Sequence, residues 1–98
     1  MPSDLKLKLD AVCDEESFIA FVAALAADRE DEVSKEKLNP SPPCGPGANG
    51  WENGTIEAFL DRSVNWAIVS KNGLEFYQKP ISPWKRCADI IYMGKIYE

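Results

Sequence analysis

The chain of 98 residues contains no histidine. Histidine is the commonest general base in catalysis and the commonest metal ligand, so its absence removes the simplest routes to both kinds of chemistry. Acidic residues remain available, yet no pattern in the sequence indicates a substrate pocket. We therefore expect no catalytic residues, no metal site and no cofactor, and an enzyme is the functional class that the sequence favours least.

Cysteine is scarce and scattered. Cys13, Cys44 and Cys87 are an odd number of thiols at wide spacing, which is not the pattern of a disulfide framework or a zinc site. Reduced thiols are typical of a cytosolic protein. Cys87 lies in the first turns of a predicted helix and is followed by apolar residues at helical spacing, so we interpret it as a buried structural thiol.

Long apolar runs are also missing. The longest, residues 18–27, has ten residues, which is too short for a helix that crosses a bilayer. The first residues carry no apolar stretch behind a basic region and so do not resemble a secretory signal. We expect a cytoplasmic protein that does not associate with membranes.

The net charge is −5, and the acidic excess lies in one part of the chain. Residues 1–38 hold ten acids and five bases, whereas residues 39–98 hold six of each. Such a chain should repel nucleic-acid phosphates and anionic lipid, so nucleic acid is not an expected ligand. A basic protein partner is electrostatically suitable, and the simpler interpretation is that the acids keep the domain soluble.

The first half of the chain predicts one long helix near residues 15–38. Asp14 is suited to cap it, and apolar residues recur at helical spacing from residue 18 to residue 25. Its first half is apolar on nearly every side, which is typical of a buried helix, and its charged second half should end at Asn39 and Pro40. The alternating leucines and lysines of residues 5–12 fit a short strand or a helical turn, and we favour the helix.

A loop rich in proline and glycine follows, from residue 39 to residue 54. It is longer than most connections, so it should carry a function or move. Trp51 is its one large apolar side chain. We expect Trp51 to pack against the helices and to leave residues 42–49 exposed as a contact for a partner.

Two further helices are predicted near residues 55–70 and 83–93. Asn53 or Thr55 can cap the first, while Ser82 and Pro83 begin the second and Gly94 should end it. The sequence thus predicts a single all-α domain over residues 1–98, a compact bundle of about three main helices. The expected core consists of Phe18, Phe21, Val22, Leu25, Phe59, Leu60, Val64, Ala88 and Ile91.

Seven residues are candidates for binding a partner, on two helix ends and the loop. They are Trp51, Glu52, Asp28, Asp31, Glu32, Lys85 and Arg86. Asp28, Asp31 and Glu32 share a helical face, for which a solvated acidic surface is the simpler interpretation than a cation site. Lys85 and Arg86 lie at a helix N-terminus, where they either bind an anion or, as we favour, pair with Asp28 or Asp31.

Two motifs are fairly specific: Gly-Trp-Glu-Asn-x-Thr-Ile-Glu-x-Phe-Leu at residues 50–60, and Pro-Trp at residues 83–84 followed by Gly-Lys-x-Tyr-Glu at residues 94–98. With them the chain resembles a family of small uncharacterised bacterial proteins that share a domain of unknown function. The resemblance covers nearly the whole chain and implies a bacterial source. It implies no activity and no catalytic residues.

The sequence leaves two main hypotheses. The first is a protein-binding or regulatory module, which in size and charge is similar to the immunity proteins that neutralise bacterial toxins. The second is a structural or accessory subunit that self-associates through its aromatic residues.

Overall fold

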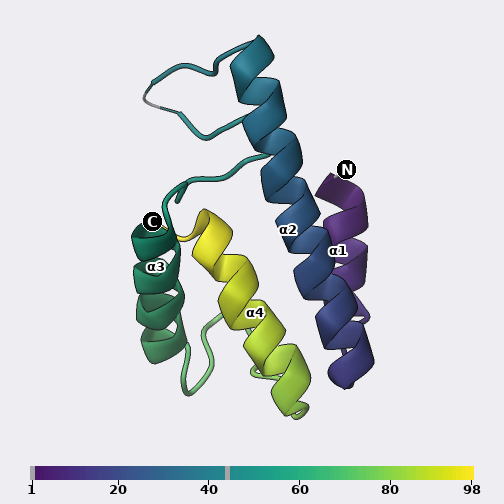
Figure 1. The fold of residues 1–98 in the computed structure, drawn as a ribbon. Helices are drawn as coiled ribbons and strands as arrows, with labels where there is room; N and C mark the ends of the chain where they lie inside the picture. The colour runs from purple at the N-terminus through teal and green to yellow at the C-terminus, as the bar shows by residue number, and fades with distance from the viewer. Residues whose placement is uncertain (1, 44) are drawn as a thin grey trace.

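The structure, a computed structural model, describes residues 2–43 and 45–98, with side chains from residue 4 onward. Four helices occupy most of this part of the chain (Figure 1): α1 Pro2–Asp10, α2 Glu15–Leu38, α3 Ile56–Val69 and α4 Pro83–Ile96. No strand is present among these residues, only an isolated bridge between Leu74 and Tyr77. The all-α prediction is confirmed. Of residues 5–12, which were ambiguous in the sequence, residues 5–10 lie in a fourth helix, α1.

The helix starts follow local signals. The Asp14 carboxylate accepts the Ser17 backbone N–H at 2.8 Å, and the Ser17 hydroxyl accepts the Asp14 N–H in return. Thr55 caps α3 by accepting the Ala58 N–H, and Ser82 caps α4 with Pro83 behind it. Each cap satisfies a backbone donor that the first turn of a helix leaves unpaired.

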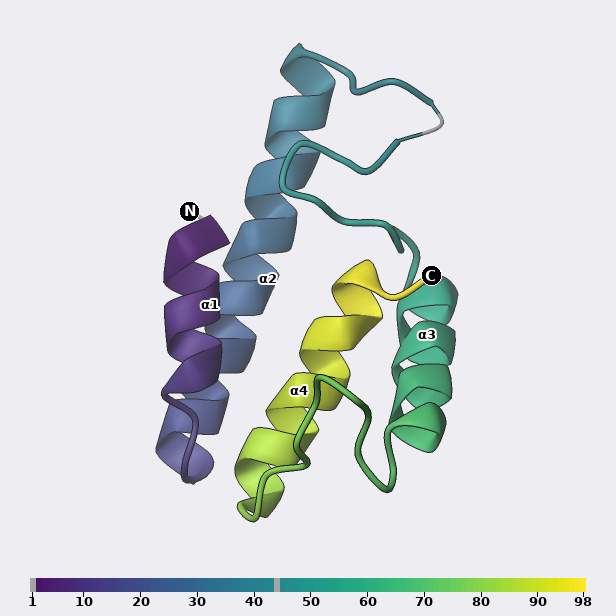
Figure 2. The same cartoon turned by 180° about the vertical axis from the view of Figure 1, so that it is seen from behind.

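The helices are arranged side by side around α4 (Figures 1 and 2). Helices α1 and α2 form an antiparallel hairpin, α4 packs against both of them, and α3 packs on the other side of α4. Over their whole described lengths, α2 and α3 have no pair of Cα atoms within 8 Å of each other. The main cluster of buried apolar side chains lies where α1, α2 and α4 meet: Leu5, Leu9, Val12, Phe21, Leu25, Trp51 and Ala88. Trp66 of α3 is buried apart from this cluster.

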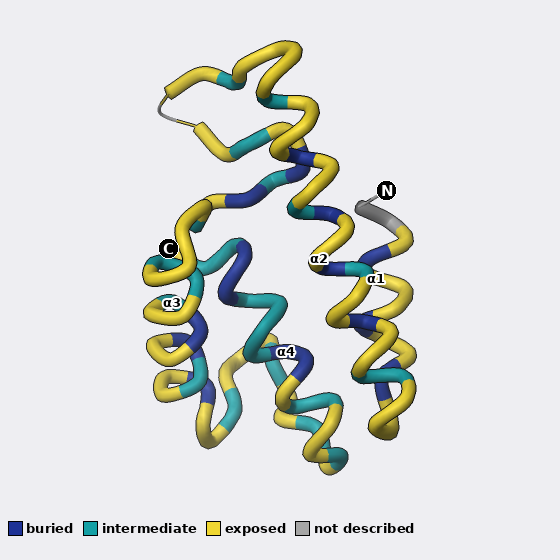
Figure 3. The backbone as a smooth tube through the Cα atoms, in the orientation of Figure 1, coloured by how far each residue is buried: buried dark blue, intermediate teal, exposed yellow. Residues whose placement is uncertain are grey.

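The predicted core is partly wrong, and the errors share a cause. Phe21, Leu25 and Ala88 are buried, whereas the side chains of Phe18, Phe59 and Ile91 are partly buried. The three wrong assignments, all of them exposed, are Val22, Leu60 and Val64. Val22 and Leu60 line a hollow between α2 and α3, and Val64 lies one turn beyond Leu60 on α3. Figure 3 shows that much of both helices is exposed.

Gly94 was expected to end α4, but the helix continues through it to Ile96. Gly94 is instead buried at the contact between α3 and α4. A Cβ atom at this position would lie 2.1 Å from Ser63 Oγ and 2.9 Å from the Phe59 carbonyl oxygen. The missing side chain thus allows the backbones of α3 and α4 to approach closely, so this glycine is a packing residue.

The Gly94→Ala variant tests this packing. Alanine in a helix interior is ordinarily more stable than glycine by about 0.5–1 kcal/mol. Here we expect the opposite sign, a loss of about 1–3 kcal/mol, because the added methyl group meets backbone that cannot move aside cheaply. Urea unfolding measures the difference.

Gly45→Ala is the matched control. A Cβ atom there would be 4.0 Å from its nearest neighbour, the Pro42 carbonyl oxygen, so its effect should stay within about 0.5 kcal/mol. A Gly94→Ala variant as stable as the parent protein would contradict the close contact of α3 with α4.

Candidate functional site

The segment of residues 47–55 crosses from the second half of α2 to the C-terminus of α4 (Figure 1). Its anchor is Trp51, which is 8% exposed, as the sequence predicted. The Trp51 indole packs against Phe59, with 6.0 Å between ring centroids, and its Nε1–H donates to Asp28 Oδ2 at 2.8 Å. Trp51 therefore joins the loop to α3 by an apolar contact and to α2 by a hydrogen bond.

The same carboxylate oxygen of Asp28 accepts a second, charged donor. Lys95 Nζ lies 2.7 Å from Asp28 Oδ2, and each of the two side chains is 5% exposed. The ammonium group also lies 5.5 Å from the centroid of the Trp51 ring, within range of a cation–π interaction. This buried ion pair connects α2 with the last turn of α4 across 67 residues of sequence.

Glu32, one turn after Asp28 on α2, accepts hydrogen bonds from the backbone of the loop. Its Oε1 accepts the N–H groups of Asn49 at 2.9 Å and Trp51 at 3.2 Å, and the Arg29 guanidinium donates to its Oε2. The carboxylate lies so close to Gly47 that a Cβ atom there would be 2.2 Å from Oε1. Glycine at position 47 therefore makes room for the Glu32 carboxylate.

Asn49 and Glu36 complete the attachment of the loop. The Asn49 side-chain amide donates to the Asp28 carbonyl oxygen at 2.9 Å and to Asp31 Oδ2 at 3.0 Å. Glu36 accepts the backbone N–H of Ser41. Hydrogen bonding to the Ser41 side chain, followed by this backbone bond, holds the pKa of Glu36 below its ordinary value. The predicted exposure of residues 42–49 is consequently wrong for Asn49, which is buried; Cys44 lies outside the described residues.

The acidic face of α2 is thus mostly internal. A solvated surface is the wrong interpretation for Asp28 and Glu32, which are 8% and 1% exposed, because both accept hydrogen bonds from the loop. Asp31 does face solvent. It forms an ion pair with Lys35, one turn later on α2, at 2.8 Å, and the ammonium group together with the Asn49 amide lowers the pKa of Asp31.

The residues after Trp51 hold the C-terminus of α4. The Glu52 N–H donates to the Lys95 carbonyl oxygen at 2.9 Å, and the Asn53 amide donates to the carbonyl oxygens of Gly94 and Tyr97. These bonds satisfy acceptors that the end of a helix leaves unpaired. Loss of hydration, followed by the nearby Glu98 carboxylate, raises the pKa of the exposed Glu52.

Lys85 and Arg86 do not reach Asp28 or Asp31, so the favoured pairing is wrong. Lys85 pairs with Asp89 on its own helix, and Arg86 donates to the Ala67 carbonyl oxygen at 2.9 Å. The Arg86 guanidinium also donates to Ser70 Oγ at 2.9 Å and lies 5.2 Å from the Trp66 ring centroid. These contacts join the N-terminus of α4 to the C-terminus of α3.

Tyr77 belongs to the same cluster as Lys85 and Arg86. Its hydroxyl donates to Asp89 Oδ2 at 2.7 Å, and its ring meets the Trp66 ring edge-on with centroids 4.8 Å apart. Burial and the Asp89 carboxylate raise the pKa of Tyr77 to about 12. The polar side chains of this cluster are therefore bonded to one another or to the end of α3.

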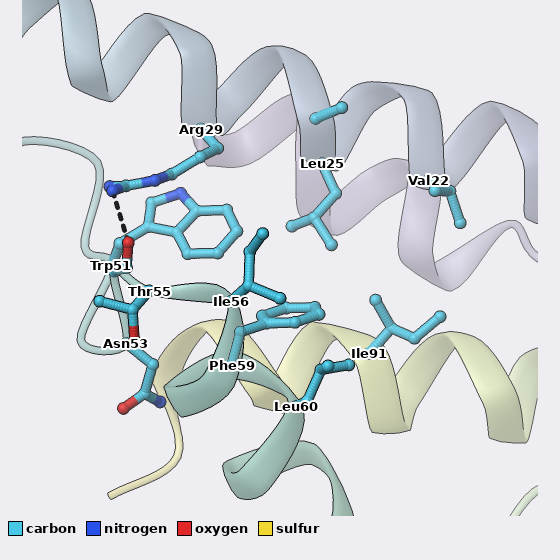
Figure 4. Close-up of a pocket in the computed structure, with 12 residues that line it drawn as sticks. Val22, Leu25, Arg29, Trp51, Asn53, Thr55, Ile56, Phe59, Leu60 and Ile91 are labelled. Carbon is cyan, nitrogen blue, oxygen red and sulfur yellow. Dashed lines mark hydrogen bonds between the residues drawn. The ribbon is translucent and has the colours of Figure 1, made fainter.

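An apolar groove of about 440 Å³ opens between α2 and α3, with α4 beneath it (Figure 4). Val22, Leu25 and Ala26 form its wall on α2, and Ile91 of α4 lies at its floor. Ile56, Phe59 and Leu60 form its wall on α3. The other lining residues are Arg29 of α2 and, in the loop, Trp51, Asn53, Gly54 and Thr55.

The polar side chains that line the groove are already bonded elsewhere. Arg29 donates to Glu32 and, at 2.9 Å, to the Gly54 carbonyl oxygen, and its guanidinium lies 5.6 Å from the Trp51 ring. Asn53 is bonded to the end of α4, and the Thr55 hydroxyl caps α3. What the groove offers to a ligand is therefore apolar surface.

The apolar surface continues beyond the groove along α3. Ile56, Leu60, Val64 and Ile68 recur every four residues, which places them in one stripe, and they are 77%, 56%, 56% and 67% exposed. On the opposite wall, Ile19 and Val22 are 58% and 36% exposed. Single exposed apolar residues are ordinary, whereas a contiguous set on facing helices is typical of an interaction site.

The two described thiols, Cys13 and Cys87, are free, and both are exposed. The buried interpretation of Cys87 is wrong, because it lies one turn before Ile91 on the side of α4 that faces the gap between α2 and α3. Among residues 2–43 and 45–98, no group of three or more cysteine, aspartate or glutamate side chains is placed to hold a metal ion. No helix in that part combines the length and apolarity needed to cross a bilayer.

No protein-family model matches the chain, and no match is found among curated proteins or solved structures. The likeness to a family of small bacterial proteins therefore stays a prediction. The arrangement of the site has to be interpreted from its own geometry.

Sequence reasoning found Trp51 and missed most of what surrounds it. Asn49 lies in a segment that was expected to be exposed, and no partner was predicted for Lys95; their distant partners on α2 explain the burial of both side chains. The groove had a signal in the sequence, since the apolar residues of α3 span a wider arc than one neighbouring helix can cover.

A double-mutant cycle on Asp28 and Lys95 tests the buried ion pair. Lys95→Met leaves the Asp28 carboxylate buried without its cation and should lower the free energy of unfolding by about 3–5 kcal/mol. Adding Asp28→Asn removes the stranded charge and keeps an oxygen for the Trp51 indole. The double variant should therefore be more stable than Lys95→Met alone in chemical unfolding.

Lys6→Met is the control, because the Lys6–Asp10 pair is more than half exposed on both sides and should contribute at most about 1 kcal/mol. If the effects of Asp28→Asn and Lys95→Met were simply additive, the two side chains would not be coupled and the assignment of the pair would be incorrect.

Proposed function

We propose that this protein is a protein-binding module and that the groove between α2 and α3 is its binding surface. The observation that carries the proposal is the apolar groove, whose walls belong to two helices with no pair of described Cα atoms within 8 Å of each other. Ile56 and Leu60 are exposed in the folded chain. A partner that buries them would therefore gain hydrophobic free energy.

The chemistry of the groove supports a macromolecular partner. Sites for small polar substrates present polar groups that fix the orientation of the ligand. Here Arg29, Asn53 and Thr55 are each bonded within the chain, so a ligand would meet side-chain shape and apolar surface. Protein interfaces have such an apolar centre within a polar rim.

Self-association is the second candidate, and one observation favours it. The apolar stripe of α3 extends past the groove to Ile68, which is 67% exposed and does not line the groove. A second copy could cover a longer and flatter surface than the groove alone. A mass in sedimentation equilibrium that rises with concentration and is restored to the monomer by Ile68→Glu would support this candidate.

The variant Leu60→Glu tests the groove as a binding surface. The side chain is 56% exposed, so the free energy of unfolding should change by no more than about 0.5 kcal/mol. A buried carboxylate in an apolar interface is costly, so partners captured from a lysate of the expressing cells should be lost. Quantitative mass spectrometry of the captured proteins measures the loss.

Leu7→Glu is the matched control, because Leu7 is 66% exposed on α1 and does not line the groove. Proteins retained by the parent chain and by Leu7→Glu, but not by Leu60→Glu, would support the groove. If the same proteins were retained by all three, the binding surface would lie elsewhere.

A further inference from the structure

We propose that the occupant of the groove is an amphipathic α-helix of another protein that carries basic residues on its flanks. The inference rests on the proposed function and adds to it the conformation and the charge of the partner segment. Three features carry it: the shape of the groove, the composition of its walls and the charge of its rim.

The shape of the groove fits a helix. Its two walls, α2 and α3, run in opposite directions on either side of α4 (Figures 1 and 2). A helix laid between them would rest on Ile91 and complete a bundle in which each wall has a neighbour. The wall from Val22 to Arg29 spans about 10 Å at 1.5 Å per residue, so it offers about two turns to a partner.

The composition of the walls indicates an amphipathic helix. A helix seated in an apolar groove presents side chains at positions i, i+3 or i+4, and i+7 to both walls. Ile56 and Leu60 provide one such wall, and Val22 and Ala26 provide the other. The outer side of the bound helix would face water, so it should be polar.

The rim of the groove is acidic. Glu30 lies four residues after Ala26, and Glu57 lies three residues before Leu60, so each is on the same flank as a wall residue. Both are exposed, and neither forms an ion pair with another described residue. Arg29, the one cation that lines the groove, is paired with Glu32. Lysine or arginine on the flanks of the partner helix would therefore meet complementary charge.

The same rim makes a second copy of this chain the less suitable occupant. Two grooves that meet face to face would bring Glu30 and Glu57 of one copy towards the same acids of the other. Each copy also carries a net charge of −5. Like charges at an interface oppose association, whereas a basic helix gains from them.

Three synthetic helical peptides of about 14 residues test the inference. The first has leucines at i, i+3, i+7 and i+10 with lysines on its flanks. The second has glutamates in place of the lysines. The third has the composition of the first, with the leucines distributed so that they share no face. Binding to the full chain is measured at low salt by calorimetry, and ¹⁵N NMR shifts locate the site.

We expect the lysine peptide to bind at least about tenfold more tightly than the glutamate peptide and the redistributed peptide. Its NMR shifts should be confined to residues 19–30, 56–64 and 91. Glu30→Gln with Glu57→Gln should weaken its binding about three- to tenfold, since two exposed charge pairs are lost. Arg62→Gln, on another side of α3, is the control and should leave the affinity unchanged.

The contrary outcomes separate the two proposals. Equal binding of the lysine and glutamate peptides at the groove would overturn the basic flanks and leave the binding module intact. Equal binding of the redistributed peptide would show that charge alone acts, which overturns the amphipathic helix. If no peptide shifts the groove while capture from lysate still depends on Leu60, the helical occupant is wrong. If capture does not depend on Leu60 either, the proposed function fails as well.

Discussion

The ion pair between Asp28 and Lys95 is the interaction on which the rest of the structure depends. It lies in the interior and joins the middle of the longest helix to the last turn of the final helix. Burial of two charges costs free energy unless hydrogen bonds and close geometry compensate. The Trp51 indole supplies part of that compensation, because it donates to the same carboxylate oxygen and places its ring beside the ammonium group. The loop is therefore part of the ion pair's environment, and its position follows from the pair.

The groove follows from the same constraint. The ion pair and Trp51 bring α2, the loop and the C-terminus of α4 together at one end of the molecule. Helix α3 is held to α4 separately, through the close approach at Gly94 and through the bonds of Arg86. Trp51, which packs on Phe59, links α3 to α2 at this end of the molecule. Beyond it, the apolar flanks of these two helices remain apart and face a common space. The groove is thus a consequence of how the helices are joined.

The sequence predicted the helix caps and helix ranges, which depend on residues close together along the chain. Asp14, Thr55 and Ser82 cap helices because their bonds span only three residues, and the helix ranges were accordingly close. The prediction from sequence failed where the burial of a residue depends on a partner far away along the chain. Asp28 was expected on a solvated acidic surface, and no ion pair was predicted for Lys95, because nothing in their local sequence indicates that they meet. On α3, Phe59, Leu60 and Val64 were all assigned to the core, because the sequence does not separate the side covered by α4, with Ser63 and Trp66, from the side left open.

Hydrogen exchange of the Trp51 indole N–H tests whether the ion pair between Asp28 and Lys95, together with Trp51, fixes the loop to α2. Of the three indole resonances, that of Trp51 is identified by its loss in a Trp51→Phe variant. This proton should exchange only when the cluster of Asp28, Lys95 and Trp51 opens. The free energy of that opening should therefore approach the free energy of global unfolding. The more exposed Trp84 serves as the internal reference. An exchange rate for Trp51 as fast as that of Trp84 would contradict the account, because the loop would then leave α2 without unfolding the rest of the chain.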